Sequence, residues 1–166
     1  MVFIILGYTA KSVSTLHGGG AEYLCLPSEP QWTGDEVDGL QFNTYIYGVE
    51  YFGHLLPNIL PDSDRHMGVP CSVCETENHN QLLMVPAATS CPAGWTKQYL
   101  GYLMAERYTH ASSSNYICVT RQYETMTETP RFQTSGYVAT VEAVCTSLPC
   151  PNYVQGRELP CVVCTK

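Results

Sequence analysis

The nine cysteines offer the most distinctive chemistry in this sequence of 166 residues. Four of them form two Cys-x-x-Cys motifs, Cys71 with Cys74 and Cys161 with Cys164, a spacing that can bind zinc, carry out redox exchange or contribute to disulfides. The motifs lie 86 residues apart, against about 15–20 in a compact zinc module, so zinc is the weaker alternative. A redox motif opens a helix, and only two residues follow Cys164. We therefore expect disulfides and an extracellular protein, in which an odd count leaves one thiol without an intrachain partner.

Five histidines could act as acids, bases or metal ligands, but the residues around them match no catalytic motif. They are His17, His54, His66, His79 and His110. Neither the Gly-x-Ser-x-Gly nor the His-Glu-x-x-His motif occurs, and each histidine is more typical of a solvated loop than of a ligand set. The run Asp62-Ser63-Asp64 resembles part of a calcium loop but lacks the other ligands. We predict no enzyme, no metal site and no cofactor.

Composition and charge exclude further classes of partner. The net charge is -7 and the pI is near 5.1, so the chain has no basic footprint for nucleic acid or for an anionic membrane surface. The longest apolar run, Met1 to Leu6, is too short to span a bilayer or to form the core of a signal peptide. We expect no membrane insertion, and we expect that a signal peptide has been removed or that the chain begins inside a longer precursor.

Four short words recur in the same order along the chain, at offsets between 90 and 94 residues. The pairs are Leu6-Gly7-Tyr8 with Leu100-Gly101-Tyr102, Tyr23-Leu24-Cys25-Leu26 with Tyr116-Ile117-Cys118-Val119, Val49-Glu50 with Val141-Glu142, and Pro70-Cys71-Ser72-Val73-Cys74 with Pro160-Cys161-Val162-Val163-Cys164. Ordered self-similarity of this kind indicates an internal duplication. We predict a first repeat over residues 1–84 and a second over 85–166, packed as one compact unit about a pseudo-twofold axis.

The elements that must position these residues are predicted to be strands. Tyr and Val alternate along residues 45–51 and again along 137–144, which is the period of a pleated strand. Residues 82–85, 95–104 and 115–119 are further candidates, and only residues 102–108 could form a helical turn or two. The 12 tyrosines and 11 prolines also favour strands and turns. The predicted fold class is mostly β.

The longer words resemble a known family. Residues 70–75, 84–86, 91–95 and 100–102 resemble the junction between the two repeats of the type IV collagen C-terminal non-collagenous domain. Residues 17–27, 101–105 and 141–166 are closer to the related domain of short-chain, spongin-like collagens of marine invertebrates. The resemblance implies tandem β-sheet repeats that oligomerise through exchanged hairpins. No Gly-X-Y tract is present, and residues 1–5 lack the family's first Cys-Pro, whereas soluble sponge lectins are similar stand-alone chains of this size.

The resemblance also implies a disulfide pattern. Carried over residue by residue, the pairs are Cys25–Cys71, Cys91–Cys164, Cys118–Cys161 and Cys145–Cys150. Cys74 then has no partner in the chain, and it is expected to be free or joined to another chain.

A polar loop precedes each Cys-x-x-Cys motif, and disulfides on both sides would hold such loops rigid for binding. Glu50 and Glu142 occupy matching strand positions, where a glycosidase pair, two similar binding carboxylates or two structural carboxylates are the alternatives. The similarity to sponge lectins favours a multivalent lectin, a homo-oligomer that binds glycans containing amino sugars such as N-acetylated hexosamines. The predicted carbohydrate-binding residues are Glu50, Tyr51, Asp64, Arg65, His66, Glu142, Asn152, Tyr153, Arg157 and Glu158. The alternative is a structural assembly module of an extracellular matrix.

Overall fold

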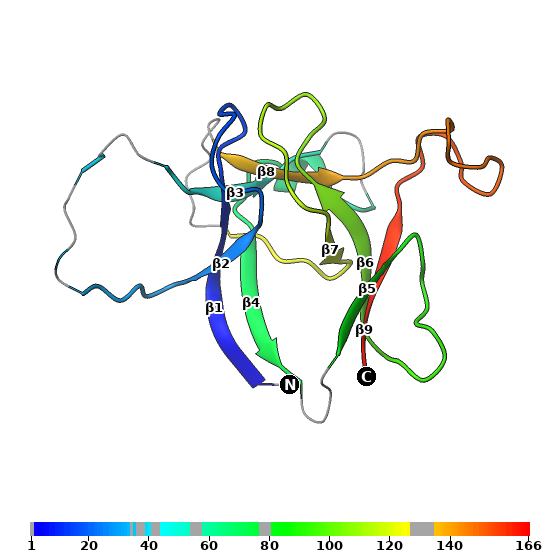
Figure 1. Ribbon diagram of the computed structural model, residues 1–166, viewed down its shortest axis with the longest axis horizontal. Helices are drawn as coiled ribbons and strands as arrows, with labels where there is room; N and C mark the ends of the chain where they lie inside the picture. Colours follow the sequence, from blue (N-terminus) through cyan, green and yellow to red (C-terminus); the bar gives the residue numbers. More distant parts are fainter. Residues whose placement is uncertain are drawn as a thin grey trace.

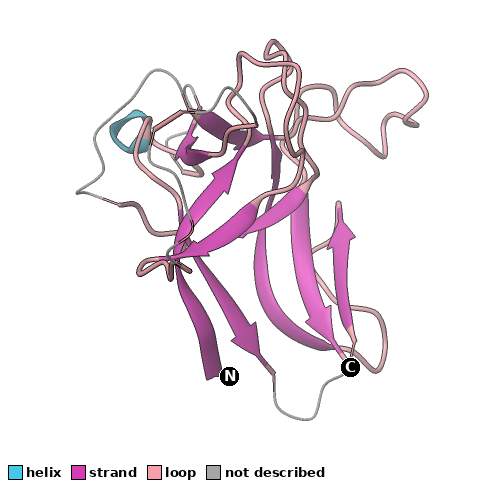
Figure 2. Ribbon diagram, turned by 60° about the vertical axis from the view of Figure 1, so that its left-hand side comes forward, coloured by secondary structure: helices cyan, strands magenta, loops and turns pink. Residues whose placement is uncertain are grey.

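The computed structural model describes residues 2–33, 35, 39–40, 44–53, 58–76, 81–126 and 135–166, and within them the chain is mostly β. The strands are β1 (Val2–Lys11), β2 (Leu24–Pro27), β3 (Tyr47–Tyr51), β4 (Pro70–Glu75), β5 (Leu82–Pro86), β6 (Thr96–Ala105), β7 (Ile117–Thr120), β8 (Gly136–Thr140) and β9 (Pro160–Thr165). A three-residue 3-10 turn over Asp62–Asp64 is the one helical element of these ranges (Figure 2). The predicted fold class, mostly β with disulfides, is confirmed at this level.

The strands form two groups joined by a central pair (Figure 1). β1 pairs with β2 and β4 in one group, and β6 pairs with β7 and β9 in the other, where β5 adds to the second side of β9. β3 and β8 run parallel between the groups, with Val49 opposite Gly136 and Tyr51 opposite Val138. Parallel pairing requires a long connection, and here it ties the first half of the chain to the second.

The two strand groups have the same register. Gly7 of β1 lies opposite Pro27 and Cys71, and Gly101 of β6 lies opposite Thr120 and Cys161. Both glycines meet the crossing strand at close range: a Cβ on Gly7 would lie 1.7 Å from the Leu26 carbonyl oxygen, and one on Gly101 would lie 2.0 Å from that of Val119. Only glycine allows so close an approach, which gives the matching Leu-Gly-Tyr words a physical cause.

The structure joins the four cysteine pairs that the resemblance implies. Cys25–Cys71 links β2 to β4 and Cys118–Cys161 links β7 to β9, with Cα separations of 5.6 and 5.8 Å. Cys91–Cys164 and Cys145–Cys150 are the other two bonds. Four disulfides in a chain of this length are typical of extracellular proteins. Among the described residues no helix has the length and apolar character that crossing a membrane requires.

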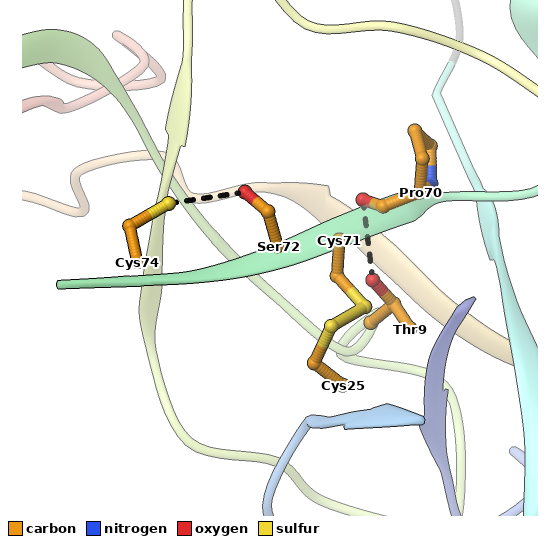
Figure 3. The surroundings of a disulfide bond; sticks show 6 residues. All are labelled: Thr9, Cys25, Pro70, Cys71, Ser72 and Cys74. Atoms are coloured by element: carbon orange, nitrogen blue, oxygen red, sulfur yellow. Dashed lines mark hydrogen bonds between the residues drawn. A yellow bond between two sulfur atoms is a disulfide. The ribbon is translucent and has the colours of Figure 1, made fainter. Parts of the chain in front are cut away.

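Cys74 is the free cysteine, and it is half-buried on β4. Its thiol donates a hydrogen bond to Ser72 Oγ at 3.6 Å, on the opposite side of β4 from the Cys25–Cys71 bond (Figure 3). On β9 the matching residue, Cys164, is joined to Cys91. β9 has strands on both sides, whereas β4 pairs with β1 alone among the described strands.

The apolar core draws on both halves of the chain. Its buried residues are Val49, Tyr51, Leu60, Val69, Met104 and Val138. Partly buried side chains of β6, β7 and their neighbours pack around them, Tyr102, Ile117 and Val119 included. The core therefore lies beneath the β3–β8 pair and not inside either strand group alone.

Residues 102–108, the stretch that could have formed a helical turn, do not form one. Residues 102–104 pair with β7, and Met104 and Ala105 pair with β8, so β6 continues as a strand to Ala105. The extended hydrogen bonds that β7 and β8 offer outweigh a weak local helical preference. The strand predicted over 137–144 ends at Thr140, and Glu142 makes an isolated bridge to Glu158.

Candidate functional site

Two buried carboxylates, one within β3 and one directly after β6, each bond a histidine. Glu50 of β3 lies 3.0 Å from His66 Nδ1 and also accepts a hydrogen bond from Ser135 Oγ at 3.0 Å. Glu106, directly after β6, lies 2.6 Å from His110 Nδ1. The carboxylate side chains are 6 % and 2 % exposed, and those of His66 and His110 are 24 % and 19 % exposed.

This geometry orients both imidazole rings. A carboxylate oxygen can only accept, so each Nδ1 carries the proton and each Nε2 is left as an acceptor in the neutral ring. Within the described part of the chain, neither Nε2 atom has a hydrogen-bond partner. Both rings are therefore fixed at Nδ1, and each keeps an Nε2 acceptor on a side chain that is partly exposed.

Glu106 is held from three further directions. Its carboxylate forms an ion pair with Lys11 Nζ at 2.7 Å and accepts the backbone N–H groups of Tyr137 and Arg107 at 3.2 and 3.1 Å. The Lys11 side chain is fully buried and crosses Gly136, where a Cβ would lie 2.6 Å from Lys11 Cγ. A buried ion pair offsets its desolvation only when further hydrogen bonds satisfy it, as they do here.

An aromatic pair stands between the two histidines. The Phe52 ring centroid lies 5.2 Å from that of Tyr137, and both rings lie within 5.9 Å of both imidazoles. The guanidinium carbons of Arg65 and Arg107 lie 5.0 and 4.7 Å from the Phe52 centroid, at cation–π distance. We call this set the Phe52 cluster: Lys11, Glu50, Phe52, Arg65, His66, Glu106, Arg107, His110, Ser135 and Tyr137.

The cluster combines three cationic side chains with two carboxylates inside a chain of net charge -7. Burial, together with the charges of Glu50 and Glu106, raises the pKa of the Tyr137 phenol, and Arg65 opposes this shift. Tyr137 is therefore neutral at physiological pH. The arrangement holds hydrogen-bonding groups rigidly around the Phe52 ring, which is itself buried.

His66 has a backbone conformation that residues other than glycine rarely adopt. Its φ is 62°, and its N–H donates to the Tyr51 carbonyl at 2.9 Å. In the second strand group Gly156 has φ 71°, and its N–H donates to the Ala143 carbonyl at 2.8 Å. The chain thus keeps a strained histidine where the corresponding turn has glycine, and strain of this kind concentrates at functional sites.

Three of the predicted residues of the first repeat meet in this cluster, and two do not. Glu50, Arg65 and His66 belong to it. Tyr51 points to the opposite face of β3, where it is buried in the core and donates to the Glu124 carbonyl at 3.0 Å. Asp64 accepts a hydrogen bond from the Tyr123 hydroxyl at 2.6 Å, which also places it outside the cluster.

The predicted residues of the second repeat lie apart from the cluster. Glu142 bridges to Glu158, and the neighbouring Ala143 N–H donates to the Arg157 carbonyl at 3.0 Å. Asn152 and Tyr153 follow the Cys145–Cys150 bond in the loop that extends away from β3 in Figure 1. Glu142 and Arg157 are both exposed. The structure therefore contains two separate sets of predicted residues.

Sequence reasoning missed most of the cluster. Lys11, Phe52, Glu106, Arg107, Ser135 and Tyr137 were not among the predicted site residues, and His110 was considered only as a loop histidine. One local signal was present, because Glu106 and His110 are four residues apart and form an ion pair. His54 and His79 lie outside the described residues, and in those that are described no group of three potential metal ligands comes together.

The comparisons with known proteins returned no match: no family model fits the chain, and neither a curated protein nor a solved structure is significantly similar to it.

Proposed function

We propose that this chain is an extracellular carbohydrate-binding protein and that the Phe52 cluster is a binding site. One observation carries the proposal: two imidazoles, 24 % and 19 % exposed and each oriented by a buried carboxylate, lie beside an aromatic pair and two guanidinium groups. Sugars are bound by fixed polar groups that bond their hydroxyls. Phe52 and Tyr137 are buried, at 8 % and 4 % exposure, so the partly exposed imidazoles are the groups that a sugar would meet. Groups that are already fixed lose little conformational entropy on binding.

The strained backbone of His66 supports a binding role over a purely structural one. A glycine at this position would remove the strain, as Gly156 does in the second strand group. Strain of this kind costs about 1 kcal/mol and concentrates at binding sites. Ala87 shares it with φ 55°, so the strain supports the proposal only together with the bond from His66 to Glu50.

The assignment of a family and of a glycan class rests on the resemblance to the domain of spongin-like collagens. The chain is a tandem duplication of the spongin-like collagen type, and its ligands are glycans with N-acetylated hexosamines, bound without a metal. Glu142, Tyr153 and Arg157 form a second, weaker site in the second repeat. The protein is secreted and assembles as a homo-oligomer, because linked weak sites raise avidity by roughly 10²–10⁴.

A glycan array with the oxidised protein tests this proposal. We expect His66→Gly, which keeps the backbone conformation and removes the imidazole, to weaken binding about tenfold, or about 1.4 kcal/mol. Glu142→Gln is the matched variant at the second set of residues, and a smaller loss is expected there. Wild-type protein that binds no glycan would reject the function, and unchanged binding by His66→Gly would reject the site.

An extracellular-matrix assembly module is the second candidate, and a specific surface favours it. Exposed apolar side chains cover β1 and β2: Ile4, Leu6, Tyr8, Leu24 and Leu26. Exposed apolar surface of this kind commonly marks a protein interface, and a second copy of the chain is the expected occupant. Light scattering at micromolar concentration, with the glycan array beside it, separates the candidates. Stable oligomers without glycan binding would favour assembly, and a monomer that binds glycans would reject the matrix role.

A further inference from the structure

The turn that follows β6 places a highly exposed aromatic ring beside the Phe52 cluster. The His110 N–H donates to the Arg107 carbonyl at 3.0 Å, so Tyr108 and Thr109 are the central residues of a β-turn. Tyr108 is 92 % exposed, the highest value among the large apolar side chains of the described residues. It therefore offers an aromatic face that solvent reaches, which the buried Phe52 ring does not.

The Arg107 guanidinium lies near both of these aromatic rings. Its carbon is 4.7 Å from the Phe52 centroid and 6.0 Å from the Tyr108 centroid. The side chain is partly exposed, and within the described ranges the guanidinium forms no ion pair and no hydrogen bond. A permanently charged group with five N–H donors is thus available to a ligand beside an exposed ring.

Positive charge is concentrated at this place in an acidic protein. Three of the eight lysine and arginine residues, Lys11, Arg65 and Arg107, belong to the cluster, although the net charge of the chain is -7. Its two carboxylates, Glu50 and Glu106, are already bonded within the cluster. With neutral imidazoles, the cluster therefore carries a net positive charge. Because salt screens charges beyond about 10 Å at 0.1 M, a ligand at the site responds to this local charge more than to distant acidic residues.

The polar groups of the cluster select different parts of a sugar. In neutral rings the Nε2 atoms of His66 and His110 are acceptors, so they bond hydroxyl groups and repel anionic oxygens. A guanidinium has donors only, and its fork matches the paired oxygens of a carboxylate or a sulfate ester. The exposed Tyr108 ring supplies an apolar face on which the C–H side of a pyranose packs.

We propose that the Phe52 cluster binds an acidic sugar unit, whose ring packs on Tyr108 and whose anionic substituent bonds the Arg107 guanidinium. The substituent is a sulfate ester or a carboxylate, since both present paired anionic oxygens. This inference rests on the proposed carbohydrate-binding function and narrows the ligands of that site to glycans that carry such a group. Tyr108 and Arg107 are then the residues that determine its specificity.

Isothermal titration calorimetry tests this with one N-acetylhexosamine oligosaccharide in three forms: unmodified, O-sulfated, and extended by a carboxylate-bearing unit. Arg107→Gln removes the charge, Arg107→Lys keeps the charge without the fork, and Tyr108→Ala removes the ring. The matched controls lie outside the cluster. Arg121→Gln makes the same charge change at an exposed residue after β7, and Tyr116→Ala removes a ring that is 62 % exposed. Thermal unfolding verifies the fold of each variant.

We expect the wild type to bind one acidic form at least about tenfold more tightly than the unmodified form, and this advantage to shrink as the salt concentration rises. The acidic form that binds more tightly distinguishes a sulfate site from a carboxylate site. Arg107→Gln should lose the preference and Arg107→Lys should keep part of it. Tyr108→Ala should weaken all three forms, and both controls should bind as the wild type does.

Equal binding of the three forms by the wild type, or a preference that Arg107→Gln retains, would overturn the acidic-sugar assignment and leave the proposed function standing. If Arg107→Gln does not fold, Arg107→Lys and the salt dependence decide in its place. Unchanged binding by Tyr108→Ala would overturn the packing of the sugar on that ring. Wild-type protein that binds no glycan at all would reject the proposed function and this inference together.

Discussion

Glu106 connects several parts of the Phe52 cluster through its carboxylate. It holds His110, pairs with the fully buried Lys11 and accepts two backbone N–H groups. Removing its charge would leave the Lys11 ammonium buried without compensation. Glutamate at this position therefore supports both the fold and the orientation of a partly exposed histidine.

Glu106→Gln should destabilise the protein by about 3–5 kcal/mol, the cost of breaking a buried pair from one side. Glu142→Gln, at an exposed residue, should change the unfolding free energy by less than about 0.5 kcal/mol. Urea unfolding of the oxidised proteins measures both. A Glu106→Gln variant as stable as the control would show that Lys11 finds another partner.

Three tyrosines connect the stability of the fold to alkaline pH. Burial raises the pKa values of Tyr23, Tyr51 and Tyr123 above the ordinary value of 10.0, and the hydrogen bond of Tyr123 to Asp64 raises its pKa further. In the unfolded chain these phenols ionise near pH 10, whereas in the folded state they stay protonated to higher pH.

The unfolding free energy should therefore fall as the pH rises above about 10, because the unfolded chain then binds fewer protons. In the folded protein, tyrosinate absorbance should show that some tyrosines ionise at a higher pH than the others. In the unfolded protein, all tyrosines should ionise over the same pH range. A Cys74→Ser background prevents thiol exchange during the titration. Simultaneous ionisation of all the tyrosines in folded protein would contradict the burial of these phenols.

At the scale of the elements, Cys25–Cys71 and Cys118–Cys161 connect strands that already share a partner, whereas Cys91, Cys145 and Cys150 lie in loops. Cys25–Cys71 closes 46 residues and Cys91–Cys164 closes 73, whereas Cys145–Cys150 closes 5. In the chain-entropy account, longer loops gain more from closure.

Replacing both cysteines of the Cys25–Cys71 bond by alanine should cost about 4 kcal/mol, and the same change at Cys145 and Cys150 about 2 kcal/mol. Chemical denaturation of the two double variants under identical conditions measures the difference. The reverse order would show that native-state packing, and not loop closure, sets the contribution of these bonds.

The two strand groups differ at the edge of β4. β9 has β5 beside it and its Cys164 is bonded to Cys91, whereas Cys74 of β4 has a free thiol. Thiol titration of unreduced protein should find one reactive thiol per chain if Cys74 is free. If Cys74 joins two chains, the titration should find none, and a non-reducing gel should show a dimer. Cys74→Ser should abolish either signal. Two thiols per chain would contradict the observed pairing.

The strand content could be predicted from the sequence because alternation and turn residues are local signals. Residues 82–85 and 96–104 lie in predicted strands that the structure contains as β5 and β6. The Phe52 cluster could not be predicted, because β3–β8 pairing and the path of Lys11 across Gly136 bring together residues far apart in sequence. Glu50 and His66 were identified from a repeat match and a polar loop, but neither feature identifies Glu106 as the second carboxylate.

At the scale of the molecule, the shared core makes each half depend on the other. Val49, Tyr51, Leu60 and Val69 of the first half pack with Met104 and Val138 of the second. Neither residues 1–84 nor 85–166 alone should therefore show a cooperative unfolding transition, whereas the two fragments mixed should recover one. Circular dichroism with thermal unfolding measures this. A cooperative transition in either fragment alone would show that the halves are independent domains.

Synthesis on the ribosome imposes an order on this architecture. β3 ends at Tyr51 and its parallel partner β8 begins only at Gly136. At about 5–20 residues per second, the gap of 85 residues takes on the order of 4–17 s to translate. During that interval Val49 and Tyr51 lack Val138, while Cys25 and Cys71 are both already synthesised. The nascent first half can therefore form its cross-link before its interior is complete, and its apolar side chains stay exposed until β8 is synthesised.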